Sequence, residues 1–105
     1  MTHRVKVKLD ANHHEIVAAL KAEGYAVQSL AAVGHGCPDI LVCDKRGELF
    51  LAEIKMPGGR NTPAQMKWQQ DWMWPVYTVR SVKDALAVCA YRDALKSLKV
   101  DTNAT

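Results

Sequence analysis

Features that define several protein classes are scarce in this sequence of 105 residues. Cysteine occurs three times, an odd number without a CxxC pair, so a disulfide framework is not expected. His35, Cys37 and Cys43 have no fourth partner at a familiar zinc spacing, which argues against a zinc site. No apolar run approaches the ~18 residues of a membrane span, and the polar start has no secretory signal core. The sequence therefore predicts a cytoplasmic protein without membrane contact.

Length and charge set further limits. The formal net charge of +3 is a mild basic excess, which suits an anionic partner without requiring one. The length and the 49% hydrophobic content are sufficient for one compact domain and too small for two. We expect a single domain over 1–105, with a core at about 12–98 and a disordered tail at 99–105.

Periodicity and turn residues predict the element order α-β-β-β-α-β-α, which indicates an α/β fold with a central mixed sheet flanked by helices. Asn12 and Glu15 suit a capping box, Thr62 with Pro63 suits a second helix start, and Ser81 suits a third. The predicted helices cover 12–23, 63 to about 74, and 82–98; the predicted strands cover 25–33, 39–43, 48–54 and 76–80. Residues 4–10 suit an edge strand or a frayed arm equally well, and 34–36 (GHG) are expected to be flexible.

The hairpin 36–55 carries charged residues at its open end. A three-residue loop at 45–47, with its glycine in the left-handed conformation, would pair residue 44 with residue 48. That register places Asp39 opposite Glu53, with Cβ atoms ~5 Å apart, and Lys55 shares their face.

Two facing carboxylates in an apolar hairpin repel each other and are poorly hydrated. A divalent cation is the natural compensation, and Mg²⁺ or Mn²⁺ would take oxygens from Asp39, Glu53 and the backbone carbonyl of Ile54. Lys55 beside the cation would orient a water or stabilise a developing oxyanion, as phosphodiester cleavage requires. A lone ExK tripeptide is better explained as a surface ion pair, and it is the facing Asp39 that favours the metal site.

The pair Pro38-Asp39 followed by Glu53-Ile54-Lys55 resembles the PD-(D/E)XK motif of restriction-endonuclease-like nucleases, whose αβββαβ core has a similar element order. Within that superfamily GCPDILV, LAEIK, PGGRNTPAQ and VYTVRSVKDAL look like the stand-alone VRR-NUC (virus-type replication-repair nuclease) domain, over roughly residues 12–88. The resemblance implies metal ligands at Asp39, Glu53 and the Ile54 carbonyl, a catalytic Lys55, and a catalytic role for Gln65, which matches the family's glutamine on the following helix. It also implies an endonuclease that acts on branched or nicked DNA.

The helix at 12–23 departs from the family pattern. Such nucleases often carry an acidic residue on its inward face, and here His13 falls on that face. Glu15 points elsewhere and is explained by capping. His13 either lines the site or is a buried histidine with its hydrogen bonds satisfied.

Helix 63–74 combines aromatic and polar residues. Trp68 and Trp72, spaced i, i+4 with Met66 and Met73 on the same broad face, are expected to pack in the core; the alternative is that they stack on nucleic-acid bases. Trp74 is expected on the opposite side, exposed at a dimer contact or against DNA. Gln65 lies at the centre of the apolar arc. We expect it near Glu53 and Lys55; the alternative is that it only bonds backbone near the helix start.

The favoured function is a Mg²⁺- or Mn²⁺-dependent DNA endonuclease that selects branched, flap or nicked DNA by structure. A resolvase-like homodimer that cuts both strands of a Holliday junction is one alternative, and a non-catalytic DNA-binding module with the same fold is another. A homodimer is expected. Phosphate contacts are predicted for four basic residues: Lys45, Arg46, Arg60 and Lys67.

Overall fold

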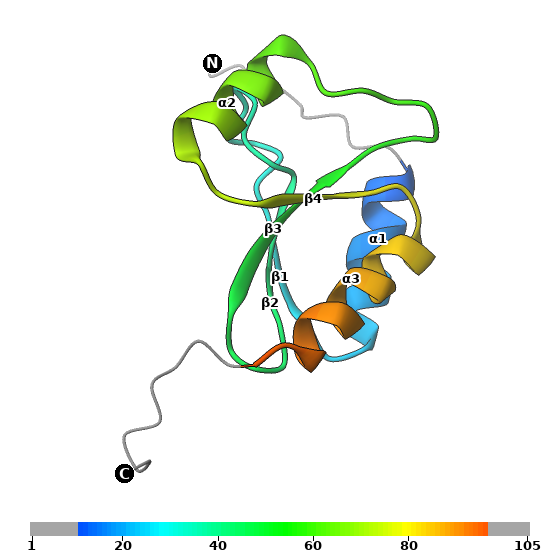
Figure 1. Cartoon of the computed structure of the whole chain (residues 1–105). Helices are drawn as coiled ribbons and strands as arrows, with labels where there is room; N and C mark the ends of the chain where they lie inside the picture. The colour runs from blue at the N-terminus through cyan, green and yellow to red at the C-terminus, as the bar shows by residue number, and fades with distance from the viewer. Residues whose placement is uncertain (1–10, 97–105) are drawn as a thin grey trace, which may run out of the picture.

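The computed structural model describes residues 11–96, so the predictions for 4–10 and for the tail 99–105 lie outside the described part. The element order is the predicted one, and the bounds are α1 (Ala11–Ala22), β1 (Ala26–Ser29), β2 (Ile40–Cys43), β3 (Leu49–Ile54), α2 (Pro63–Trp72), β4 (Val76–Val79) and α3 (Val82–Ala94). The four strands form one sheet in the order β1-β2-β3-β4, antiparallel except for the parallel pair β3–β4. The prediction of an α/β fold with a mixed sheet is confirmed (Figure 1).

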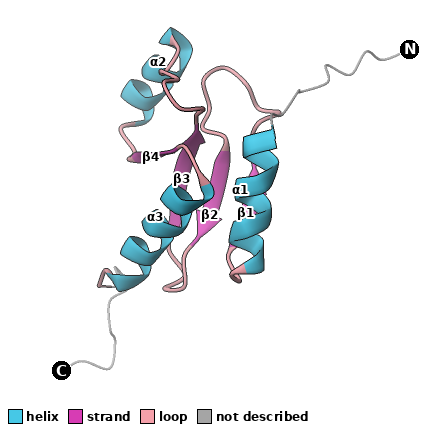
Figure 2. Cartoon of the chain, turned by 90° about the vertical axis from the view of Figure 1, so that its right-hand side faces the viewer, coloured by secondary structure: helices cyan, strands magenta, loops and turns pink. Residues whose placement is uncertain are grey.

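The helices are distributed unevenly about the sheet. Helices α1 and α3 lie side by side over one face, whereas α2 lies beyond one end of the strands (Figures 1 and 2). The core lies between that helical pair and the sheet, and consists chiefly of Ile16, Leu20, Ile40, Val42, Phe50, Ala52, Ile54, Val79, Ala85 and Cys89. Because side chains alternate along a strand, Leu41, Leu49 and Leu51 point to the opposite, open face. No helix within 11–96 is long and apolar enough to cross a membrane.

The β2–β3 hairpin has the predicted turn and register. The Asp44 N–H donates to the Glu48 carbonyl at 2.8 Å, and Gly47 has φ 83°, as a left-handed turn position requires. Ile40 then pairs with Ala52, in the ladder expected from the turn.

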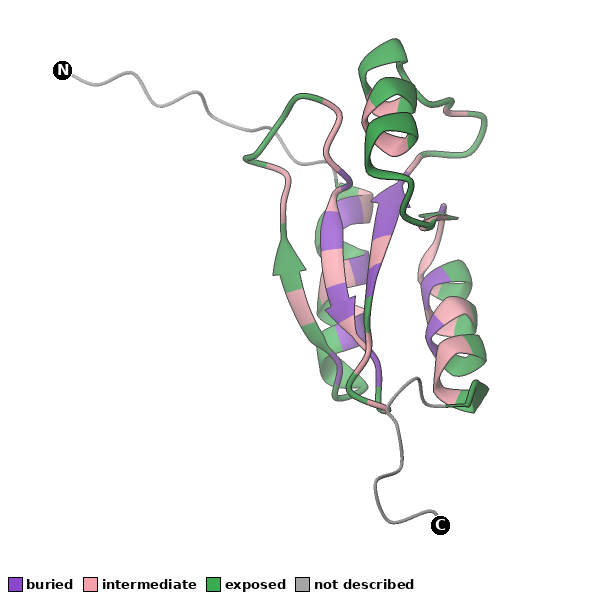
Figure 3. Ribbon diagram, turned by 60° about the vertical axis from the view of Figure 1, so that its left-hand side comes forward, coloured by how far each residue is buried: buried purple, intermediate pink, exposed green. Residues whose placement is uncertain are grey.

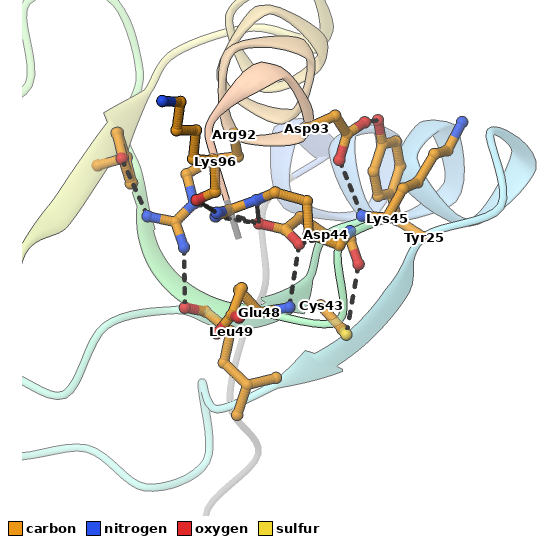
Figure 4. Close-up of polar contacts among 11 residues, drawn as sticks. Tyr25, Cys43, Asp44, Lys45, Glu48, Leu49, Arg92, Asp93 and Lys96 are labelled. Atoms are coloured by element: carbon orange, nitrogen blue, oxygen red, sulfur yellow. Dashed lines mark hydrogen bonds and ion pairs between the residues drawn. The ribbon is translucent and has the colours of Figure 1, made fainter. Parts of the chain in front are cut away.

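A buried carboxylate fixes this turn to α3 (Figure 4). Asp44 accepts the backbone N–H groups of Arg46 and Glu48 at 2.9 and 3.0 Å, and its Oδ2 lies 2.9 Å from the Arg46 guanidinium and 3.4 Å from that of Arg92. Burial alone would raise the pKa of Asp44, but these donors hold it below its usual value. The Arg46 side chain is 9% exposed, and its guanidinium is bonded to Asp44 and to the Lys96 carbonyl, so it is poorly placed for the phosphate contact predicted for it. The Lys96 carbonyl, 50 residues further along the chain, is a partner that local sequence patterns do not indicate.

The two helices of the core layer differ slightly from expectation. Helix α1 begins at Ala11, and Asn12 lies inside it rather than capping it: its amide donates to the Lys55 and Arg80 carbonyls, each at 3.3 Å. Asn12 therefore fixes the start of α1 to the ends of β3 and β4. Helix α3 begins after the predicted cap Ser81 but ends at Ala94, before the predicted residue 98.

Helix α2 has the predicted start. The Thr62 hydroxyl accepts the Gln65 N–H at 3.2 Å, the Gln65 Oε1 accepts the Thr62 N–H at 2.8 Å, and Pro63 occupies the first helical position. This reciprocal capping box satisfies two donors that a helix start otherwise leaves open.

The prediction that α2 packs its tryptophans into the core is wrong. No residue of α2 is buried, Trp72 is 65% exposed and Met73 is 87% exposed (Figure 3). Since α2 lies beyond the strand ends, its apolar residues have no sheet face directly beneath them. The Trp68 and Trp72 rings stack on each other instead, with centroids 5.0 Å apart. The helix ends at Trp72, two residues earlier than predicted, because Met73 adopts the left-handed conformation with φ 52°.

Candidate active site

The two predicted acidic residues meet at the open end of the hairpin. Asp39 directly precedes β2 and Glu53 lies in β3, so the ladder that pairs Ile40 with Ala52 brings them opposite each other. Both point to the open face of the sheet, because their neighbours Ile40 and Ile54 face the core. The Asp39 Oδ2 accepts the Ile54 N–H at 2.7 Å, which fixes the orientation of that carboxylate.

Glu53 is unfavourably placed as an anion. Its side chain is buried at 1% exposure. Burial, the charge of Asp39 and a hydrogen bond with Asp39 raise the pKa of Glu53 to about 8, and the charge of Lys55 only partly opposes them. The buried Oε2 has no hydrogen-bonding partner within residues 11–96. A cation would relieve both the repulsion and the unsatisfied oxygen.

Gln65 connects the charged groups. Its Nε2 donates to Glu53 Oε1 at 2.7 Å, and its Oε1 accepts from Lys55 Nζ at 2.5 Å as well as from the Thr62 N–H. Lys55 Nζ itself lies 3.9 Å from Glu53 Oε1. The predicted proximity of Gln65 to Glu53 and Lys55 is confirmed, and the alternative that Gln65 bonds only backbone is wrong, although the backbone contact is present as well. Because both ends of the amide are engaged, Gln65 holds the neighbouring charged groups in position.

The donor set suits a hard cation. Asp39 and Glu53 supply carboxylate oxygens, one of them unsatisfied, and oxygen ligands are what Mg²⁺ and Mn²⁺ prefer. Residues 11–96 contain no group of three or more His, Cys, Asp or Glu side chains able to hold a metal. Backbone oxygen, such as the Ile54 carbonyl, and solvent would therefore have to complete the shell.

A turn that the sequence suggested to be flexible borders the site. Residues 34–37 form a tight turn closed by the Cys37 N–H, which donates to the Gly34 carbonyl at 3.1 Å. Gly36 in this turn abuts the first turn of α2, which carries Gln65. Cys37 lies close enough to the carboxylates that, after burial, the charges of Glu53 and Asp39 raise the pKa of its thiol. The GHG sequence before Pro38-Asp39 was the available signal for this turn.

An apolar groove of about 500 Å³ continues from the site along the open face. Leu41 and Leu51 line it from the sheet, and Trp68, Trp72 and Trp74 line it from α2 and the segment after it. No charged side chain within the described residues lines this groove. Trp74 is 52% exposed, in agreement with its predicted exposure, but the prediction that it lies on the side opposite Trp68 and Trp72 is wrong, because all three line this groove.

The basic residues lie at different distances from the carboxylates. Lys45 lies in the turn at the other end of the hairpin, about 20 Å along the strand from Asp39 at ~3.3 Å per residue, with its Nζ 5.0 Å from the Tyr25 ring centre. Arg60 is exposed in the loop before α2, and Lys67 is exposed on α2, 3.0 Å from Asp71. Only these last two lie in segments next to the site.

Two further basic groups have structural contacts. Arg80 donates to the Met56 and Gly59 carbonyls, each at 2.9 Å, and so fixes the loop that leads to α2. His13 is buried, as its place on the helix face predicted, and its Nε2 lies 3.4 Å from Ser29 Oγ on the helical side of the sheet. That side is opposite to the carboxylates, which favours the satisfied buried histidine over a site residue.

Comparison with family models, curated proteins and solved structures finds no match to this chain.

Proposed function

We propose that the chain is a metal-dependent DNA endonuclease with a restriction-endonuclease-like αβββαβ core of the VRR-NUC type. One observation carries the proposal: the buried carboxylate of Glu53 faces the partly exposed carboxylate of Asp39, beside a lysine that Gln65 holds in place. As two anions, such a pair destabilises the fold unless a proton or a cation compensates the charge, and a role in metal binding would account for its presence. A cytoplasmic location is part of the same proposal.

The chemistry is hydrolysis of a phosphodiester, in which a water oxygen bonds to phosphorus and the bond to the leaving oxygen breaks. A bound Mg²⁺ or Mn²⁺ would supply charge neutralisation at the scissile phosphate and a more acidic water. Asp39 and Glu53 would hold the cation, and the Ile54 N–H orients Asp39 for that role. Lys55 Nζ has donors beyond its bond to Gln65, and these can contact a phosphate oxygen or the attacking water. Gln65 keeps Lys55 and Glu53 in a fixed relation.

The groove supports a preference for DNA with unpaired bases. Its indole and leucine side chains offer apolar and stacking surface on the same sheet face as the carboxylates. A flap or branched substrate provides unstacked bases next to the scissile phosphate, whereas plain duplex does not. Arg60 and Lys67, in the adjoining segments, are the proposed phosphate contacts.

The test is cleavage of a panel of flaps, four-way junctions, nicked circles and plain duplex with Mg²⁺, Mn²⁺ or EDTA. Wild-type protein and Glu23→Gln, a change at an exposed glutamate of the turn after α1, should cut flap or branched DNA in either metal. Glu53→Gln should bind the DNA but not cut it. DNA binding without cutting by the wild type in both metals would establish the non-catalytic module instead.

The groove also favours the resolvase-like homodimer as a second candidate. A surface with Trp72 and Trp74 more than half exposed is of the kind that protein interfaces bury, and its lack of charge lets two copies with the same net charge approach. Sedimentation of the wild type and of Trp72→Glu separates the two uses of the groove. A dimer that Trp72→Glu dissociates supports the resolvase form, whereas a monomer whose tryptophan fluorescence is quenched by single-stranded DNA supports base binding.

A further inference from the structure

The turn that precedes the first carboxylate has an unusual backbone. Gly34, His35 and Gly36 have φ of 71°, 56° and 82°, three consecutive values in the left-handed region. With the Cys37 N–H bonded to the Gly34 carbonyl, the two central residues have the positive φ of a type I′ turn. His35 tolerates this conformation better than most residues with side chains, and glycine accepts it without steric cost.

The position of this turn explains why residue 36 has no side chain. A Cβ built on Gly36 would lie 2.1 Å from the Ala64 carbonyl oxygen and 2.8 Å from the Gln65 nitrogen. Both atoms belong to the backbone of α2, so a flexible side chain cannot move aside to relieve the clash. A Cβ built on Gly34 meets nothing within 4 Å, although its φ is similarly positive. The two glycines thus share a conformation and differ in their surroundings.

The contact at Gly36 bears on Gln65 because α2 has few other constraints. No residue of α2 is buried, so packing against a core does not fix its position. The peptide group that Gly36 abuts is the one that carries Gln65, whose side chain must reach Glu53 and Lys55 simultaneously at 2.7 and 2.5 Å. A small displacement of α2 would break at least one of these hydrogen bonds.

We infer that Gly36 is a positioning residue: its absent side chain seats the 34–37 turn against α2, and this contact sets Gln65 between Lys55 and Glu53. The kinetic consequence rests on the proposed nuclease function, but the structural consequence does not. Gly36 touches neither metal nor substrate and acts through Gln65.

The experiment compares Gly36→Ala with the matched control Gly34→Ala, each alone and together with Gln65→Ala. Both alanines adopt a left-handed φ, so both should lower the melting temperature, and Gly36→Ala should lower it further because its Cβ also meets the backbone of α2. Only Gly36→Ala should shift the NMR resonances of the Gln65 side-chain amide. In single-turnover cleavage Gly36→Ala should lose roughly 10- to 100-fold, the scale of a misplacement near 1 Å, whereas Gly34→Ala should stay close to wild type. In the Gln65→Ala background, Gly36→Ala should cause no further loss.

Each outcome separates the inference from the proposed function. Equal amide shifts and equal rates for the two alanine variants would overturn it, and so would an additive loss in the Gln65→Ala background. If the wild type cuts no DNA, the nuclease proposal fails, and the amide shifts alone decide the role of Gly36. If Gly36→Ala does not fold, the wild-type protein still gives a test: a strong nuclear Overhauser effect between the Gly36 Hα and Gln65 N–H protons supports the contact, and its absence removes it.

Discussion

Replacement of Glu53 by glutamine should stabilise the metal-free protein. The amide keeps the shape of the side chain, still accepts from Gln65 Nε2, and can donate to the Asp39 carboxylate without the protonation that the glutamate requires. The wild-type pKa rises from 4.5 to about 8 on folding, so at pH 7 folding must discharge a carboxylate that is ionised in the unfolded chain. At about 1.4 kcal/mol per pKa unit, this costs roughly 3 kcal/mol. When Glu53→Gln removes this cost, the melting temperature of a domain of this size should rise by about 10–20 °C.

The sign of the pH dependence follows from the raised pKa. Glu53 contributes most to stability below the unfolded value of 4.5, and that contribution is lost as the pH rises towards about 8. The gap between Glu53→Gln and wild type should therefore be small near pH 4.5 and widen up to pH 8. Thermal unfolding followed by circular dichroism in EDTA measures it, with Glu23→Gln as a control that should behave as wild type.

Metal should reverse the order of stability. Excess Mg²⁺ or Mn²⁺ stabilises whichever protein binds it, by about 4.1 kcal/mol at about 1,000 times the dissociation constant, which exceeds the roughly 3 kcal/mol advantage of Glu53→Gln at pH 7. Wild type should gain this stability and Glu53→Gln should not. If the two proteins have the same melting temperature at pH 8 in EDTA, the facing carboxylates are not in conflict and the reasoning fails.

Three other predictions follow from named contacts. Gln65→Glu should keep the capping contact to the Thr62 N–H but lose the N–H group that donates to Glu53. Turnover should therefore fall at least about tenfold while α2 stays helical, and unchanged turnover would assign Gln65 to capping alone. Ca²⁺ should bind, as calorimetry can measure, but support little cleavage, because its larger and looser shell positions water less well; turnover equal to that with Mg²⁺ would contradict the mechanism. Asp44→Ala should lower the free energy of unfolding by about 3–5 kcal/mol at pH 7, because it leaves Arg46 without its buried partner. This effect should shrink as the pH falls through the lowered pKa of Asp44. A loss below ~1 kcal/mol in urea denaturation would show that solvent replaces that partner.

Local chemistry was sufficient to predict much of the fold and the core of the site. The helix start at Thr62 and Pro63 depends on residues within one turn, and the hairpin register depends on a loop of three residues. Because register is counted outward from the turn, the meeting of Asp39 and Glu53 needed no long-range information. Each of these features could be read from neighbours in the sequence.

Long-range packing accounts for the features that sequence reasoning missed. The spacing of Trp68 and Trp72 indicates an apolar helix face but not what lies opposite it, and α2 proves to lie beyond the strands. The burial of Arg46 depends on Asp44 and on the Lys96 carbonyl, which follows 50 residues later in the chain. The contact between Gly36 and α2 likewise joins segments that no periodic pattern relates.

Two buried carboxylates on the same hairpin show what distinguishes the candidate site from the scaffold. Asp44 is 4% exposed and Glu53 is 1% exposed, so both have lost their hydration. Asp44 is compensated by backbone N–H groups and two guanidinium groups, and its pKa is lowered. Glu53 has one amide donor, an unsatisfied oxygen and a facing carboxylate, and its pKa is raised. At one end of the hairpin a buried carboxylate is thus fully compensated by groups of the chain. At the other end the buried Glu53 is not, and such a local conflict is expected where an external cation completes the site.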